Sequence, residues 1–110
     1  MTLRNDICRI EISVDHTFSI GSADNKPYDK VYYAKDYSEQ DKDYYYKALS
    51  LRIETHSEIY RIALIGSCYS DDEDCAVLEN DVLTVLLDDV VIRINVLTGE
   101  LIRTVNTEYI

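Results

Sequence analysis

Apolar and polar positions alternate along most of the chain, and this period-two pattern predicts β-strands rather than helices. The longest example spans residues 8–20, where Ile10, Ile12 and Val14 alternate with charged and hydroxylated residues. The alternation predicts one long or bent strand with a single buried face. His16 shares the apolar parity of this stretch, so we expect it to be a histidine of the core rather than a metal ligand.

Two further strands are predicted after the only proline, Pro27. Residues 30–35 and 44–53 are rich in tyrosine and aliphatic residues, and the charged stretch 36–43 separates them. These segments predict two strands joined by a polar loop. A helix over residues 35–47 is a weaker alternative, because no apolar stripe with a spacing of three to four residues runs through it.

From Glu58 onward the pattern becomes a meander of short strands. Apolar strands are predicted at residues 59–65, 76–78, 82–87, 90–97 and 101–105. Pairs of turn-forming residues separate the last four strands: Asn80-Asp81, Asp88-Asp89 and Thr98-Gly99. We therefore expect a single all-β domain over residues 1–110, built as a small antiparallel β-sandwich or as an open barrel or meander of about eight strands.

Part of this meander resembles a known family. Residues 60–66, 75–86 and 92–101 are similar to a bacterial family of β-meander proteins whose hairpins look like those of propeller blades. The resemblance spans roughly residues 59–105 and implies neither an activity nor any site residue. Because a propeller needs about four or more four-stranded blades, we expect a sandwich or an open barrel from a chain of 110 residues.

The charge balance is strongly acidic, with 21 Asp and Glu against 11 Lys and Arg and a formal net charge of −10. Residues 71–110, which we call the acidic segment, contain ten acidic and two basic residues and so hold most of the negative charge. Such a field repels nucleic acid and anionic membranes and attracts basic proteins. The alternative interpretation is that the charge serves solubility alone.

The three cysteines, Cys8, Cys68 and Cys75, lack CxxC spacing and do not indicate a disulfide scaffold. Cys68 and Cys75 could face each other across a hairpin, although reduced thiols are favoured in a cytoplasmic chain. The first residues lack the apolar run of a secretion signal, and no stretch of eighteen apolar residues is present. We expect a soluble cytoplasmic protein without a membrane contact.

No motif in the sequence specifies a reaction. The three glycines are isolated, which excludes a glycine-rich phosphate loop. A zinc site made of Cys8, His16, Cys68 and Cys75 would lack the ligand spacing of structural zinc sites. We therefore expect no cofactor, no metal site and no catalytic residue, and we interpret the chain as a protein that is not an enzyme.

Two clusters remain as candidates for binding a partner. Seven tyrosines fall between residues 28 and 46, and they are typical either of a recognition surface or of a two-stranded ribbon with aromatic cross-strand pairs. The carboxylates of residues 71–74 lack the spacing of a calcium loop, so they form either a solvated hairpin tip or a contact surface for a basic partner. The candidate partner-binding residues are Tyr32, Tyr33, Tyr37, Asp71, Asp72, Glu73, Asp74, Asp88 and Asp89.

The leading hypothesis is an acidic protein-binding module that acts on a basic or nucleic-acid-binding protein without contacting nucleic acid itself. An inhibitor of the anti-CRISPR type and an immunity or antidote protein that neutralises a toxin are concrete versions of it. The alternatives are a small-molecule-binding β domain with a pocket lined by apolar residues and His16, or a structural protein of a larger assembly. A homodimer formed by sheet extension is compatible with each of them.

Overall fold

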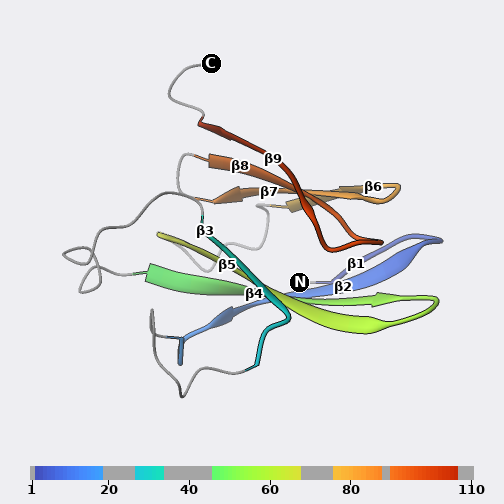
Figure 1. Cartoon of the computed structure of the whole chain (residues 1–110), viewed down its shortest axis with the longest axis horizontal. Helices are drawn as coiled ribbons and strands as arrows, with labels where there is room; N and C mark the ends of the chain where they lie inside the picture. The colour runs from blue at the N-terminus through green and yellow to red at the C-terminus, as the bar shows by residue number, and fades with distance from the viewer. Residues whose placement is uncertain (1, 19–26, 34–45, 68–75, 88–89, 107–110) are drawn as a thin grey trace.

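The structure, a computed structural model, describes residues 2–18, 27–33, 46–67, 76–87 and 90–106. The described residues form nine strands in two sheets, which are seen as two layers in Figure 1. Five strands form the first sheet in the order β1-β2-β4-β5-β3, and four form the second in the order β6-β7-β8-β9. The predicted all-β fold is confirmed as two packed sheets, and it is not a closed barrel.

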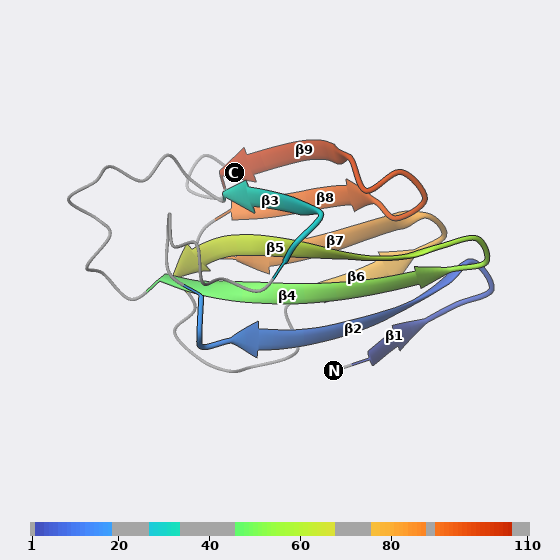
Figure 2. The ribbon, with the colours of Figure 1, turned by 60° about the horizontal axis from the view of Figure 1, so that its bottom comes forward.

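The strands of the first sheet are β1 (Thr2–Arg4), β2 (Cys8–Asp15), β3 (Lys30–Tyr33), β4 (Tyr46–Thr55) and β5 (Ile59–Ser67). Those of the second sheet are β6 (Ala76–Glu79), β7 (Val82–Leu87), β8 (Val90–Asn95) and β9 (Leu101–Asn106). Figure 2 shows both sheets from the side of the first. Neighbouring strands are antiparallel throughout except for β3 and β5, which are parallel.

Strand β1 was not expected from the sequence, because three residues are too few to show an alternating pattern. Asn5 makes the turn that joins it to β2. The side-chain oxygen of Asn5 accepts hydrogen bonds from the main-chain N–H groups of Ile7, at 2.9 Å, and Cys8, at 3.0 Å. This local bonding of an Asn side chain stabilises a tight turn and so allows β1 to pair with β2.

Strand β2 is shorter than predicted, because a turn at Asp15 ends it. The Asp15 carboxylate accepts hydrogen bonds from the main-chain N–H and the hydroxyl of Thr17, at 3.0 and 2.6 Å, and from the hydroxyl of Tyr28, at 2.7 Å. Asp15 is 5% exposed, whereas His16 is exposed in the turn that follows. The prediction of a core histidine is therefore wrong, since the Asp15 side chain bonds to the following backbone and interrupts the alternation.

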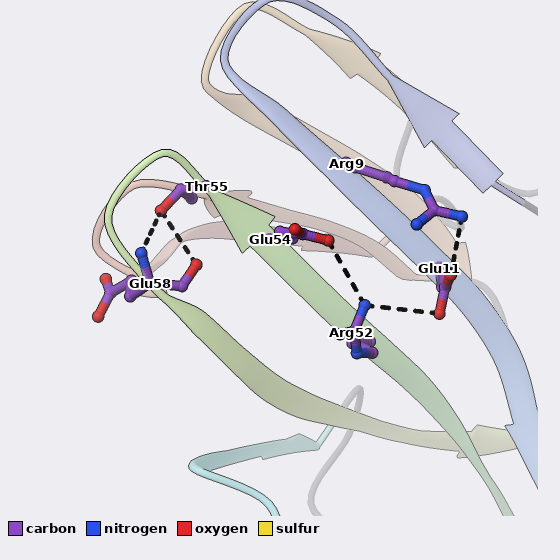
Figure 3. Close-up of polar contacts among 6 residues, drawn as sticks. All are labelled: Arg9, Glu11, Arg52, Glu54, Thr55 and Glu58. Atoms are coloured by element: carbon purple, nitrogen blue, oxygen red, sulfur yellow. Dashed lines mark hydrogen bonds and ion pairs between the residues drawn. The ribbon is translucent and has the colours of Figure 1, made fainter.

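Strands β3 and β4 are not neighbours, so the alternative of a tyrosine-rich ribbon made by pairing these two strands is wrong. Strand β5 lies between them and pairs with both. Thr55 favours this order because its hydroxyl accepts a hydrogen bond of 3.2 Å from the main-chain N–H of Glu58 in the turn between β4 and β5 (Figure 3). The same hydroxyl accepts a hydrogen bond of 3.4 Å from the main-chain N–H of Ser57. Adjacent strands joined by a short turn pair readily, which leaves the far edge of β5 for β3.

The core lies between the two sheets and takes alternate residues from each, as the period-two pattern predicts. The largest fully buried side chains of this core are Ile10, Leu51, Ile53, Ile62 and Leu64 from the first sheet, Leu83, Val85, Leu87, Ile92 and Ile94 from the second, and Val96 from the loop after β8. Burial of each of these side chains contributes roughly 1.5–3 kcal/mol relative to its exposed state. The interior is thus packed with aliphatic side chains.

A smaller apolar cluster lies on the outer face of the first sheet, at one end. Ala48, Ala63 and Ile65 are fully buried there, and Phe18 and Tyr28 pack against them. The rings of Phe18 and Tyr28 meet edge to face, with centroids 6.4 Å apart. The segment after β2 therefore covers one part of this face.

The second sheet matches the predicted meander closely. Asn80, in the predicted turn between β6 and β7, has a φ of 53°, and Gly99, in the predicted turn between β8 and β9, has a φ of +74°. Strand β8 ends at Asn95, two residues earlier than predicted, because the Asn95 side chain accepts hydrogen bonds from the main-chain N–H groups of Leu97 and Thr98. The predicted turn at residues 88–89 lies outside the described residues.

In the part of the chain that the structure describes, no helix is long and apolar enough to cross a membrane.

Candidate functional site

Two of the nine predicted partner-binding residues, Tyr32 and Tyr33, belong to the described part of the chain, and both lie on β3. The others lie outside the described residues: Tyr37, Asp71, Asp72, Glu73, Asp74, Asp88 and Asp89. Tyr33 is 46% exposed.

The side chain of Tyr32 is used inside the fold. It packs against the main core, and its hydroxyl donates a hydrogen bond of 2.8 Å to the main-chain oxygen of Gly99. Gly99 lies in the loop between β8 and β9, so this bond joins the first sheet to the second. The neighbouring position, Tyr33, is on the opposite face of the strand because side chains alternate.

A second tyrosine, Tyr60 on β5, holds the same loop. Its hydroxyl donates a hydrogen bond to the main-chain oxygen of Val96. Its ring lies against Gly99, where an added Cβ atom would be 3.1 Å from the ring. Burial raises the pKa of Tyr60 to about 12, and the nearby Glu58 carboxylate acts in the same direction. The sequence could have indicated this role, because Tyr60 has the same parity as Ile62 and Leu64.

Exposed hydrophobic side chains occur along the second sheet and its last loop: Val77 and Leu86 lie on the outer face, whereas Leu101 is opposite the buried Ile94 and so lies on the inner side of the edge strand β9. Of the eight large hydrophobic residues that are exposed in the described part of the chain, five belong to this region. We call them the apolar patch: Val77, Leu86, Leu97, Leu101 and Ile102. Their exposed fractions lie between 39% and 57%. Sequence reasoning missed this patch, although adjacent apolar pairs such as Leu86-Leu87 predict it, since only one of two neighbours can face the core.

The centre of the patch lies on the outer face of the sheet. Val77 is opposite Thr84 in the β6–β7 pair, and Leu86 is opposite Val91 in the β7–β8 pair. These four positions alternate with core residues and therefore face away from the first sheet. Glu79 is exposed two residues beyond Val77, on the same face.

The patch lies within the acidic segment, residues 71–110, whose net charge is −8 from ten acidic and two basic residues. In the described part of this segment, Glu79 and Glu100 are exposed and flank Val77 and Leu101 respectively. Arg93 is also exposed on the outer face and stands opposite Arg103 of β9, so charges of both signs surround the apolar residues of the described second sheet.

The outer face of the first sheet carries a different set of charges. Six residues of β1, β2, β4 and β5 form what we call the arginine face: Arg4, Arg9, Glu11, Arg52, Glu54 and Arg61. The carboxylate oxygens of Glu11 lie 3.0 Å from a guanidinium nitrogen of Arg9 and 3.8 Å from one of Arg52 (Figure 3). The same guanidinium nitrogen of Arg52 lies 3.6 Å from a carboxylate oxygen of Glu54. The ion pairs are partly exposed, so each contributes at most about 1 kcal/mol.

A shallow groove of about 280 Å³ opens where the β1–β2 turn meets the end of β4. His56 lies in its wall, and the Nε2 atom of His56 is 2.8 Å from the main-chain oxygen of Asp6, so this nitrogen carries the hydrogen in the bond. Cys8 also lines the groove, but burial raises the pKa of its thiol, which disfavours the nucleophilic thiolate. Within the described ranges no three His, Cys, Asp or Glu side chains are grouped so that they could hold a metal ion.

No family model, curated protein or solved structure matches the chain.

Proposed function

We propose that the chain is an acidic protein-binding module, and that its four-stranded sheet engages a basic protein partner and inhibits or neutralises it. The observation that carries this proposal is the position of the apolar patch within the acidic segment. Scattered single hydrophobic residues are normal on protein surfaces, whereas a group on one sheet is typical of an interaction site.

The patch and its surroundings have the composition of a protein interface. The centre of such an interface is apolar, and its rim is polar and accessible to water. Val77 and Leu86 supply apolar area on the outer face, and Glu79 supplies a carboxylate next to it. Negative charge at the rim selects a basic partner and accelerates its association, while the apolar centre supplies most of the affinity.

The loop that completes the patch is held in place by the first sheet. Tyr32 and Tyr60 bond to the main-chain oxygens of Gly99 and Val96, on either side of the exposed Leu97. A loop that is ordered before binding loses less conformational entropy when the partner docks. The contribution of these tyrosines to binding is therefore indirect, through the position of the loop.

The inhibitory role rests on the charge of the acidic segment. A protein that binds nucleic acid presents lysine and arginine side chains in a groove, and a compact acidic surface competes for them. The carboxylates of residues 71–74 and 88–89 stay candidates for this contact, whereas Tyr33 lies on the outer face of the first sheet, away from the four-stranded sheet. The alternative of an internal ligand pocket that includes His16 is disfavoured, since His16 lies exposed in a turn.

The test compares three forms of the chain in a pull-down from its host lysate at low and high salt. The forms are the wild type, the double variant Val77→Ser/Leu86→Ser, and Ile59→Ser, whose side chain is 56% exposed on the other sheet. We expect the wild type and Ile59→Ser to retain one basic protein at low salt, and the double variant to bind that purified protein at least tenfold more weakly. Equal binding by all three forms, or capture of no basic protein, would contradict the proposal.

A further inference from the structure

Arginines lie directly opposite one another at two places on the outer face of the first sheet. Arg4 is paired with Arg9 across β1 and β2, and Arg52 is paired with Arg61 across β4 and β5. Like charges in directly opposed positions destabilise a sheet. Arg93 and Arg103 are opposed in the same way across β8 and β9 of the second sheet. What distinguishes the first sheet is that the carboxylates of Glu11 and Glu54 lie between its two arginine pairs.

The four central residues of the arginine face largely neutralise one another. Arg9 is opposite Glu54 and Glu11 is opposite Arg52 in the β2–β4 pair, so positive and negative side chains alternate. Among the described residues, three ion pairs form on this face, and all of them are made by these four residues. The carboxylates of Glu11 and Glu54 are therefore already paired with arginines of the same face.

The two outer arginines, Arg4 and Arg61, take no part in these ion pairs. Both are exposed, and within the described part of the chain neither side chain forms an ion pair with a carboxylate. Asp29 lies near Arg61, but its carboxylate accepts a hydrogen bond of 2.8 Å from the main-chain N–H of Arg61. The arginine face thus has four positive and two negative side chains, with its unpaired charges at the two ends.

We propose that the arginine face is a docking surface for an acidic protein segment, whose carboxylates bind Arg4 and Arg61. Guanidinium groups bind carboxylates through two parallel hydrogen bonds, which gives the contact both strength and direction. Arg4 and Arg61 lie on β1 and β5, which are three strand spacings apart, and they stand in neighbouring rows: Arg4 is level with Arg9, whereas Arg61 is level with Arg52, two residues further along the sheet. Their Cα atoms are therefore about 16 Å apart. An extended segment that crosses the strands covers about 14 Å in four residues, and the long arginine side chains span the difference, so acidic residues four positions apart fit the two ends.

A protein segment fits this face better than a nucleic acid. A nucleic-acid strand carries a phosphate at every nucleotide and would place phosphates over Glu11 and Glu54, in the middle of the face. A peptide can leave neutral residues there and carry carboxylates only at the ends. The net charge of −10 also repels a polyanion over long distances, whereas a short contact with two charges is less affected because salt screens charges beyond about 8 Å.

This surface is separate from the apolar patch, which lies on the second sheet. The inference therefore does not rest on the proposed function, and the double variant Val77→Ser/Leu86→Ser is expected to leave it unchanged. One face would serve a basic partner and the other an acidic one.

The experiment uses the full chain and a synthetic peptide in which aspartate recurs every fourth residue, separated by three serines. A peptide of the same composition with its aspartates adjacent is the control for spacing. Binding is followed by the chemical shifts of backbone amides at low salt. We expect amides of β1, β2, β4 and β5 to shift with the spaced peptide, and the adjacent-aspartate peptide to bind at least fivefold more weakly.

Variants then locate the contact. Arg4→Gln/Arg61→Gln is expected to weaken binding at least tenfold, while Arg93→Gln, an exposed arginine on the second sheet, leaves it unchanged. The thermal midpoint of the double variant should stay the same or rise, because two like-charge contacts are removed, and this separates lost binding from lost folding. Binding that survives the double variant, an equal loss in Arg93→Gln, or tighter binding of a single-stranded oligonucleotide would each overturn the proposal.

Discussion

Replacing Tyr60 with phenylalanine is expected to change how stability depends on pH. Burial raises the pKa of Tyr60 to about 12 in the folded chain, against an ordinary value of 10.0. In the unfolded chain the hydroxyl loses its proton near pH 10, whereas the folded chain retains it until about pH 12. Between these values the unfolded state binds fewer protons, so the free energy of unfolding falls as the pH rises, and below pH 10 this loss is absent.

The size of the effect follows from the difference between the two pKa values. Each pKa unit corresponds to 1.36 kcal/mol, so the loss of stability by pH 12 is at most about 2.7 kcal/mol, and less in proportion to the remaining solvent contact of the ring. At pH 7 the variant Tyr60→Phe loses only the hydrogen bond to the main-chain oxygen of Val96, which costs about 1 kcal/mol. The variant should thus be less stable than the wild type at pH 7 and more stable near pH 12.

Urea denaturation followed by far-ultraviolet circular dichroism, at intervals from pH 7 to pH 12, measures the free energy of unfolding of the wild type and of Tyr60→Phe as a function of pH. Tyr28 is a useful comparison because burial also raises its pKa, so Tyr60→Phe should keep a smaller alkaline loss of stability. The double variant with Tyr28→Phe should keep only a residual loss, to which the thiol of Cys8 contributes because burial raises its pKa too. The reasoning is refuted if Tyr60→Phe loses stability as steeply as the wild type above pH 10. In that case the Tyr60 hydroxyl would not be buried against the loop between β8 and β9.

Two further predictions concern the same loop. Gly99→Ala should lower stability by about 1–2 kcal/mol, because a φ of +74° is strained for alanine and the new Cβ would meet the Tyr60 ring at 3.1 Å. Gly99→Asn, which tolerates this φ better, should lose less in the same urea titration, and an equal loss would show that φ is not the cause. Tyr32→Phe should lower stability by about 1 kcal/mol through loss of the hydrogen bond to Gly99, which is a fall of about 4 °C in the thermal midpoint. Affinity for the partner should fall only slightly, because the loop is then less ordered before binding. Weaker partner binding at an unchanged midpoint would instead make Tyr32 a direct contact.

The candidate site shows where sequence reasoning reaches its limit. A cluster of tyrosines in the sequence predicts aromatic contacts, but it does not say whether each ring packs inside the fold or lies at the surface. The two neighbours differ: Tyr32 donates a hydrogen bond to the main-chain oxygen of Gly99 inside the fold, whereas Tyr33 is exposed. The apolar patch was available in the sequence as adjacent apolar pairs. The arginine face was not, because its residues are far apart in the chain and are brought together by pairing of β1, β2, β4 and β5.

Local pattern determined the all-β class, the strands of the meander and the turns at residues 80–81 and 98–99. These features depend on neighbouring residues, through side-chain alternation and the φ values that Asn and Gly tolerate. Tertiary structure alone decided that β5 lies between β3 and β4, that Asp15 is buried under Tyr28, and which arginines stand opposite each other. The physical reason is that strand order and register are set by contacts between distant segments, and many pairings bury the same alternating residues equally well.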